Sequence, residues 1–147
     1  MKFRVYLTFA LLALSLSLFF TSCEKDEKTN PDKPYIGLWL VEKDTYKENG
    51  SDLVTTYYDD PQVYYINVKS NGTWTEEESY LGEEPIVRNY QYELIGNDSL
   101  LIYTNTPADG HKIRFEVSGL SMKLFEKGYK EVQGQSIPYT YVRYLYK

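Results

Sequence analysis

The sequence has very little cysteine or histidine: Cys23 and His111 are the only residues of their kinds among 147. One cysteine cannot form an intramolecular disulfide, so the hydrophobic core must stabilise the fold alone. One histidine and one cysteine also supply too few ligands for a zinc site, and no Ser-His-Asp arrangement is indicated. Because His111 follows the Asp109-Gly110 turn, we expect it to be a solvated residue at the start of a strand.

Other features of catalytic proteins are missing as well. The sequence contains no phosphate-binding loop and no dinucleotide fingerprint, so we expect no cofactor and no metal. A carboxylate pair for glycoside hydrolysis would meet in space rather than along the chain, and nothing in the sequence supports one. We therefore expect a protein that is not an enzyme.

Charge is absent from residues 5–23, which directly follow a start with two basic residues. A basic start, a long apolar stretch and small residues at its end predict a secretory signal peptide, with a retained membrane-spanning helix as the alternative. Thr21-Ser22-Cys23 resembles the bacterial lipobox, after which signal peptidase II cuts and the cysteine is acylated, for example with palmitate. We interpret residues 1–22 as a lipoprotein signal peptide and Cys23 as the lipid-bearing first residue of the mature protein.

Residues 24–34, EKDEKTNPDKP, contain no apolar side chain except proline. High charge and proline predict a solvated, flexible tether, so we expect residues 23–34 to link the lipid to a folded domain. Glu24-Lys25-Asp26-Glu27 resembles the acidic export signal that sends some Gram-negative lipoproteins to the outer face of the outer membrane. These features predict a bacterial envelope protein anchored in the outer membrane by the lipid on Cys23, with periplasmic and surface orientations both open.

The chain is acidic, and removal of residues 1–22 would leave 14 basic against 21 acidic residues, a net charge of −7. An acidic domain is a poor partner for nucleic acid, whose binding depends on neutralising phosphates. We therefore expect no nucleic-acid partner.

No helical period is sustained from residue 35 to residue 147. Short segments rich in tyrosine, valine, isoleucine and threonine alternate with turn residues, which predicts one antiparallel β domain over 35–147. We expect strands at about 36–47, 62–69, 73–80, 86–95, 99–105, 111–117, 120–126 and 138–146, with 53–58 either a further strand or part of the first hairpin. Short reversals such as SNGT at 70–73 favour an all-β fold, an eight-stranded antiparallel up-and-down barrel.

One turn predicts an apolar face. A two-residue loop at Ser118-Gly119 would pair Val117 with Leu120, which places Phe115 and Met122 on the same side of the sheet. The opposite side of this hairpin is charged. Such a hairpin fits a barrel wall with one covered side.

The Asn71-Gly72 turn decides which glutamates face inward. A two-residue turn would place Glu77 opposite Ile66 on the inner face, whereas a bulge at Gly72 would place Glu76 and Glu78 on that face. A buried unpaired carboxylate is costly. An inward glutamate therefore requires an open polar lumen, an arginine or tyrosine partner, or a strand end that projects beyond the core.

Two segments carry a family resemblance. Gly37-Leu38-Trp39 opens the first expected strand, and VYYINVKSNGTWTEEE at 63–78 contains an aromatic strand, an NGT turn and a return strand. With the last strand, YVRYLYK, these segments resemble the lipocalin-like domains of bacterial envelope lipoproteins. The resemblance implies an eight-stranded barrel with Gly37 and Trp39 at its closed end and a late arginine, here Arg143, over the indole. The chain departs from most lipocalins in having no Thr-Asp-Tyr motif and no C-terminal helix. We expect Trp39 to pack in the core rather than to bind ligand.

Tyrosine is unusually frequent, with 16 in the chain. It suits a half-buried pleated surface, so most rings are expected to be scaffold, although exposed tyrosines also bind sugars and protein partners. The open-lumen interpretation predicts a ligand cavity with the candidate residues Tyr64, Trp74, Glu77, Tyr92 and Tyr103. We expect a non-catalytic domain that binds a small, partly apolar ligand. The alternatives are a surface module, an inhibitor or complex subunit, that recognises glycan or protein through exposed tyrosines, and a purely structural part of a surface complex.

Overall fold

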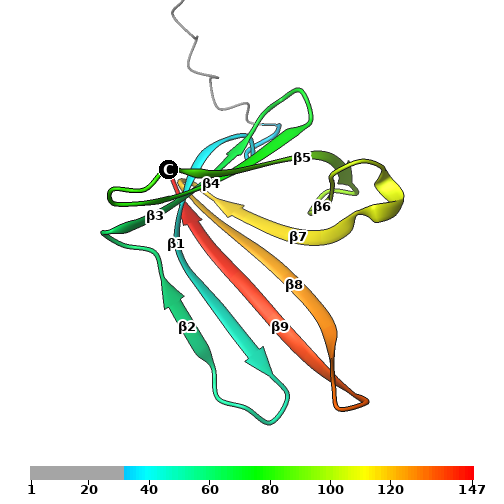
Figure 1. Ribbon diagram of the computed structural model, residues 1–147. Coiled ribbons are helices and arrows are strands. Elements are labelled where there is room, and N and C mark those ends of the chain that lie inside the picture. The colour runs from blue at the N-terminus through cyan, green and yellow to red at the C-terminus, as the bar shows by residue number, and fades with distance from the viewer. Residues whose placement is uncertain (1–31) are drawn as a thin grey trace, which may run out of the picture.

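The computed structural model describes residues 32–147, so the predicted signal peptide, Cys23 and most of the tether lie outside the described residues. β-Strands make up most of the described chain (Figure 1). In chain order its elements are β1 (Gly37–Glu48), β2 (Val54–Tyr57), β3 (Gln62–Val68), β4 (Thr73–Tyr80), β5 (Ile86–Ile95), β6 (Ser99–Tyr103), the single-turn helix η1 (Pro107–Asp109), β7 (His111–Ser118), β8 (Ser121–Val132) and β9 (Gln135–Tyr146).

Eight of these strands form a closed antiparallel barrel. From β3 onward each strand pairs with the next one in the chain, and β1 joins the two ends by pairing with both β3 and β9. The predicted all-β, eight-stranded up-and-down barrel is therefore confirmed. Within residues 32–147, β2 pairs with β1 alone and lies outside the circle, so the segment 53–58 contains a separate strand.

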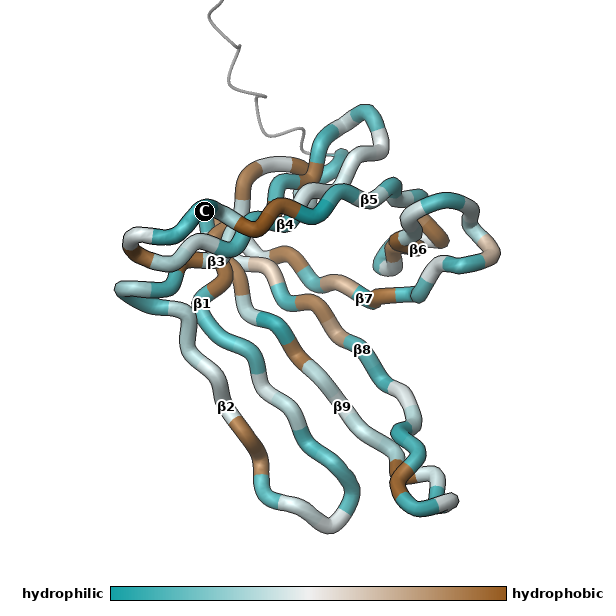
Figure 2. The backbone as a smooth tube through the Cα atoms, viewed as in Figure 1, coloured by the Kyte–Doolittle hydropathy of each residue, from teal (hydrophilic) through white to brown (hydrophobic). Residues whose placement is uncertain are grey.

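Four strands project beyond the rest of the barrel. β3 pairs with β1 only over residues 37–40, whereas β9 pairs with β1 over residues 40–48. Where β3 diverges, β2 takes its place, so that β2, β1, β9 and β8 continue as one curved sheet, the long lower part of Figure 1. Figure 2 shows that this projecting part is mostly hydrophilic or neutral, which suits a sheet that is exposed to solvent on both faces.

The β8–β9 hairpin is longer than predicted. The predicted strands were too short because glycine and proline, here Gly128 and Pro138, usually mark the end of a strand. The ring of Tyr139 lies where a Cβ of residue 128 would be, at 2.7 Å, so the missing side chain leaves no gap. The carbonyl of Pro138 accepts a hydrogen bond from the N–H of Asn49, just past the end of β1, at 3.0 Å. The imide nitrogen of Pro138 faces the same side, so it costs no hydrogen bond to β8.

The core fills the end of the barrel at which β1 begins. Its most completely buried side chains are Trp39, Val41, Ile66, Val68, Trp74, Leu100 and Met122. Tyr35, just before β1, is also buried, so the chain enters the domain at this closed end. The indole N–H of Trp39 donates to the carbonyl of Tyr35 at 2.9 Å, which avoids the cost of an unpaired buried donor.

Lys147 lies over Trp39, with its Nζ 4.3 Å from the ring centroid and 2.9 Å from the carbonyl oxygen of Ile36. Burial lowers the pKa of this amine below its ordinary value. A Cβ at residue 37 would lie 2.9 Å from the same nitrogen, and φ of Gly37 is +134°, so glycine is required there. The expectation that Arg143 covers the indole is wrong; Arg143 lies farther along the lumen.

The β3–β4 turn follows the bulged alternative. Val68 pairs with Trp74, and Gly72 has a φ of +86°. This register places Glu76 opposite Ile66 on the inner face and Glu77 on the outer face. The placement of Glu77 expected from a two-residue turn is therefore wrong.

The β7–β8 turn also differs from the predicted one. Val117 pairs with Met122 rather than with Leu120, and Leu120 lies exposed in the turn. The shift is two residues, so Phe115 and Met122 still share the inner face.

Candidate functional site

An open cavity of about 540 Å³ occupies the lumen beyond the core. Its volume lies within the range of pockets that hold small organic ligands. Trp74, Ile113 and Leu124 supply apolar wall, and tyrosines, His111 and charged side chains supply the remainder. The lining residues are Tyr46 of β1, Tyr64 of β3, Trp74 and Glu76 of β4, His111 and Ile113 of β7, Leu124, Glu126, Tyr129 and Lys130 of β8, and Tyr139, Tyr141 and Arg143 of β9.

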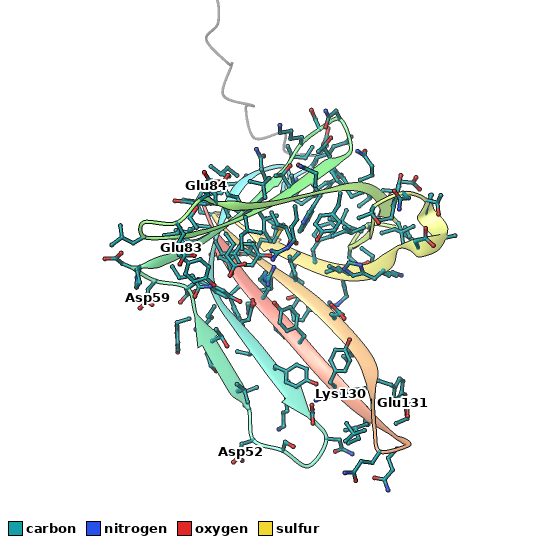
Figure 3. All side chains as sticks on the ribbon, in the orientation of Figure 1. Asp52, Asp59, Glu83, Glu84, Lys130 and Glu131 are labelled. Atoms are coloured by element: carbon teal, nitrogen blue, oxygen red, sulfur yellow. The ribbon has the colours of Figure 1, made fainter. Side chains whose placement is uncertain are left out.

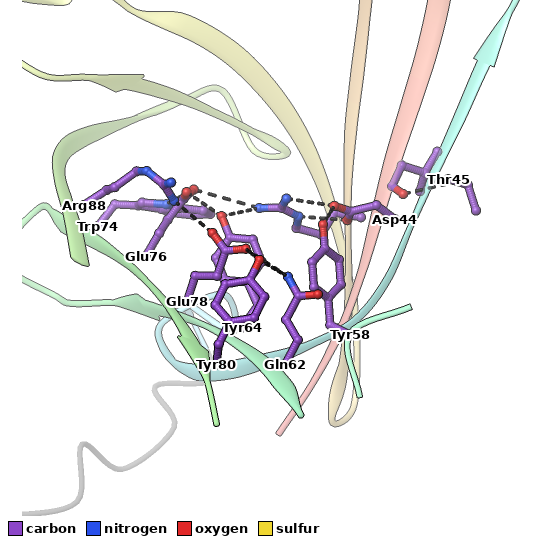
Figure 4. Close-up of polar contacts among 12 residues, drawn as sticks. Asp44, Thr45, Tyr58, Gln62, Tyr64, Trp74, Glu76, Glu78, Tyr80 and Arg88 are labelled. Atoms are coloured by element: carbon purple, nitrogen blue, oxygen red, sulfur yellow. Dashed lines mark hydrogen bonds and ion pairs between the residues drawn. The ribbon is translucent and has the colours of Figure 1, made fainter. Parts of the chain in front are cut away.

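Arg143 and Asp44 form a bidentate ion pair at the floor of this cavity. The guanidinium donates from Nε to Asp44 Oδ1 at 2.9 Å and from Nη2 to Oδ2 at 2.8 Å, and the two side chains are 14% and 8% exposed. Tyr58, next to β2, donates its hydroxyl to Asp44 Oδ2 at 2.7 Å (Figure 4). Charge-assisted bonds of this fork geometry hold both groups in one orientation.

A β-bulge in β1 turns Asp44 inward. The register with β9 shifts between Val41 and Lys43, so the alternation of side chains is interrupted at that point. Trp39 and Val41 face the core, and Asp44 is the next inward residue, where strict alternation would have placed Lys43. The bulge thus converts an apolar stretch of β1 into a polar one as the strand leaves the core.

The ion pair changes how its members titrate. Burial alone would raise the pKa of Asp44, but the hydrogen bonds and charge of Arg143 outweigh burial and lower this pKa below its ordinary value. Burial and the bond to Asp44 raise the pKa of Tyr58 to about 12. Burial likewise raises the pKa of Tyr64 and Tyr141, so these phenols stay protonated at neutral pH.

Glu76 continues the polar network from β4. Arg143 Nη1 donates to the Tyr64 hydroxyl at 2.9 Å, and this hydroxyl donates to Glu76 Oε2 at 2.5 Å. Trp74 Nε1 donates to Glu76 Oε1 at 3.0 Å, which fixes the indole against the carboxylate. We call Asp44, Arg143, Tyr64, Glu76 and Trp74 the floor network. Within residues 32–147, no buried side-chain nitrogen or oxygen lacks a hydrogen-bond partner.

The projecting strands form the rim of the cavity. The rings of Tyr46 and Tyr139 lie 5.5 Å apart between centroids, tilted by 34°. Tyr139 donates to Glu126 at 2.7 Å, which places a carboxylate beside this aromatic pair. Lys130, labelled on the projecting end of β8 in Figure 3, donates to Glu48 at 2.8 Å.

Two of the five predicted ligand residues line the cavity, namely Tyr64 and Trp74. Glu77 lies on the outer face, and its neighbour Glu76 occupies the lumen. Tyr92 is buried at the closed end, where its hydroxyl donates to the carbonyl of Lys69 at 2.6 Å.

Tyr103 also lies outside the cavity. It pairs with Gln91 on the outer face of β6 and donates to Glu93 at 2.9 Å.

Sequence reasoning missed Asp44 and Glu126 as members of the site. No signal in the sequence marks Asp44 as inward, whereas Glu126 continues the alternation of Met122 and Leu124 and could have been found from it.

The part of the chain that the structure describes contains no group of three or more histidine, cysteine, aspartate or glutamate side chains arranged to hold a metal. Residues 32–147 also include no helix whose length and hydrophobicity would let it cross a membrane.

Comparison of the sequence with models of known protein families finds no match, and comparison with curated proteins finds none either. The site is therefore interpreted from its own geometry.

Proposed function

We propose that this protein is a lipid-anchored envelope lipoprotein whose lipocalin-like barrel binds a small, partly apolar ligand without catalysis. The observation that carries the proposal is the cavity of about 540 Å³ between a packed core and an open rim. Eight strands enclose enough space for one small ligand beyond a filled end. Both apolar and polar side chains reach this space, as a ligand of mixed polarity requires.

The position of the tether supports a mouth that points away from the lipid. The described chain enters through Asp32 and the buried Tyr35 at the closed end, whereas Tyr46, Tyr139 and Lys130 surround the cavity on the projecting strands. A 12-residue tether over 23–34 spans at most about 40 Å when fully extended. Acylation of Cys23 would then place the closed end nearest the membrane and leave the mouth accessible.

The alternative, a surface module that recognises glycan or protein, has one observation in its favour. Tyr57, Lys43, Tyr144 and Lys123 form a row across the outer face of β2, β1, β9 and β8. The two lysines lie 5.1–5.6 Å from the tyrosine ring centroids, so the rings and cations already contact one another. Because these rings and cations already contact one another, the row supports recognition of glycan or protein less strongly than the open cavity supports binding of a small ligand.

Native mass spectrometry of the protein purified from its own host tests the proposal. We expect a small co-purifying mass, and we expect Ile113→Trp to lower its occupancy because the larger indole would project into the cavity and narrow it. Arg114→Trp is the matched control: it is the adjacent residue of β7, faces outward over Phe125 and should keep the mass. The intact mass also reports whether residues 1–22 are removed and Cys23 is acylated.

Two outcomes would contradict ligand binding. One is a wild-type protein that carries no small molecule. The other is an adduct whose occupancy is the same in Ile113→Trp as in the wild type, although the melting curve of the variant shows a folded barrel.

A further inference from the structure

Three of the tyrosine hydroxyls around the cavity already donate to carboxylates of the protein. Tyr46 donates to Glu48 at 2.7 Å, Tyr64 to Glu76 at 2.5 Å and Tyr139 to Glu126 at 2.7 Å. A phenol has one O–H donor and keeps lone pairs that accept. These hydroxyls can therefore accept a hydrogen bond from a ligand, but they can donate one only by releasing a carboxylate.

The stronger donors of the wall are engaged in the same way. Trp74 has a single N–H, and it donates to Glu76. Arg143 directs three N–H groups to Asp44 and Tyr64, and Lys130 donates to Glu48. Around Glu126 and the Tyr46–Tyr139 pair, the hydrogen-bonding capacity that remains is thus that of acceptors, which match a ligand group that donates. Lys130, His111 and Tyr129 keep N–H or O–H donors elsewhere in the lining.

The charges around the cavity favour a cation over an anion. The charged side chains that line the cavity are Glu76, Glu126, Lys130 and Arg143, and His111 lines it as well. Asp44 and Glu48 lie behind this lining, each paired with one of the two cations. Arg143 pairs with Asp44 at 2.8 Å and lies 4.0 Å from Glu76, and Lys130 pairs with Glu48. In the described part of the chain, no basic nitrogen lies within 4.0 Å of Glu126, whose bonded partner is the hydroxyl of Tyr139.

The aromatic rings supply a second attraction for positive charge. Tyr46 and Tyr139 form a tilted pair directly beside Glu126, and the face of a tyrosine ring attracts ammonium groups. Ile113 and Leu124 provide the apolar wall across which the body of a ligand can lie. Resting on the proposed binding function, we infer that the ligand carries a positively charged hydrogen-bond donor, an ammonium group, on an apolar body, with Glu126 as its counter-ion.

Three probes that share one apolar body test this inference: 4-phenylbutylamine, 4-phenylbutan-1-ol and 4-phenylbutyrate, titrated calorimetrically into the intact protein. We expect the amine to bind at least tenfold more tightly than the alcohol, and the carboxylate to bind most weakly. Glu126→Gln should weaken binding of the amine by about tenfold and leave the alcohol unchanged, because it removes charge and keeps shape. Glu77→Gln is the matched control, since this glutamate lies on the outer face.

Each other outcome overturns the inference. If the alcohol binds as tightly as the amine, or if Glu126→Gln leaves binding of the amine unchanged, the charge of the ligand is misassigned while a ligand-binding cavity still stands. If none of the three probes binds but the host-purified protein carries a small molecule, the inference fails and the proposed function survives. If no probe binds and no small molecule co-purifies, both the inference and the proposed function are contradicted.

Discussion

Replacing Arg143 with leucine should lower the free energy of unfolding by about 3–5 kcal/mol, measured by urea denaturation. The substitution leaves Asp44 buried without its bidentate partner, and it also removes the donor to Tyr64. The cost arises mainly because an uncompensated carboxylate remains in a site that is 8% exposed.

Two further variants separate this cause from the loss of a charge alone. Arg114→Leu removes an arginine that pairs with Glu116 at 2.8 Å on the exposed outer face, and it should cost less than about 1 kcal/mol. The double variant Asp44→Leu with Arg143→Leu should recover part of the loss, since it leaves no orphaned charge. Equal losses for Arg143→Leu and Arg114→Leu would show that the pair is not buried in solution.

The same pair should make stability depend on acid. Because the pKa of Asp44 is lower in the folded chain, the unfolded chain takes up this proton first as the pH falls. The stabilisation is therefore fully present above the ordinary pKa of about 4 and is lost as the pH falls through the lower folded-state value. The wild type should lose stability more steeply than Asp44→Asn below about pH 5; parallel curves would contradict a lowered pKa.

Replacing Trp39 with alanine should also lower the free energy of unfolding by about 3–5 kcal/mol. The indole is fully buried, its N–H bonds the carbonyl of Tyr35, and its face lies under Lys147, so truncation creates a cavity and leaves two partners without their contact. Thermal and urea denaturation followed by circular dichroism measure this loss.

Matched variants define what Trp39 contributes. Trp39→Phe keeps an aromatic ring and should cost less than alanine, because it loses the N–H but fills most of the space. Leu38→Ala removes a neighbouring side chain that is 57% exposed, and it should change stability by less than about 0.5 kcal/mol. If Trp39→Ala were as mild as Leu38→Ala, the closed end would not be the core of the domain.

Turn geometry explains why the sequence predicted the strands better than the site. The β7–β8 turn shifts the predicted pairing by two residues, and a shift of two leaves every side chain on its face, so Phe115 and Met122 remain inward. The β3–β4 turn shifts the pairing expected from a two-residue turn by one residue. A shift of one moves each side chain of β4 to the opposite face, so Glu76 rather than Glu77 faces inward. The residue composition of a turn indicates that a reversal occurs, but not always how many residues it contains.

Asp44 could not have been found by alternation. It becomes inward only because β1 bulges after Val41, and no residue type in that stretch marks the bulge. Arg143 was singled out from the family resemblance, yet it lies in the floor network, and Lys147 has the position over Trp39. The general architecture thus follows from strand patterns, whereas the chemistry of the lumen depends on single-residue shifts in register.

The most direct test of an open, ligand-accepting lumen uses the fluorescence of Trp74. The chain has two tryptophans, so Trp39→Phe leaves Trp74, which lines the cavity, as the only indole. Titration of this variant with the neutral dye N-phenyl-1-naphthylamine should quench Trp74 and raise dye emission together, saturating at one dye per protein. Trp74 emission that stays constant while dye is added in large excess would contradict an accessible cavity and with it the central claim.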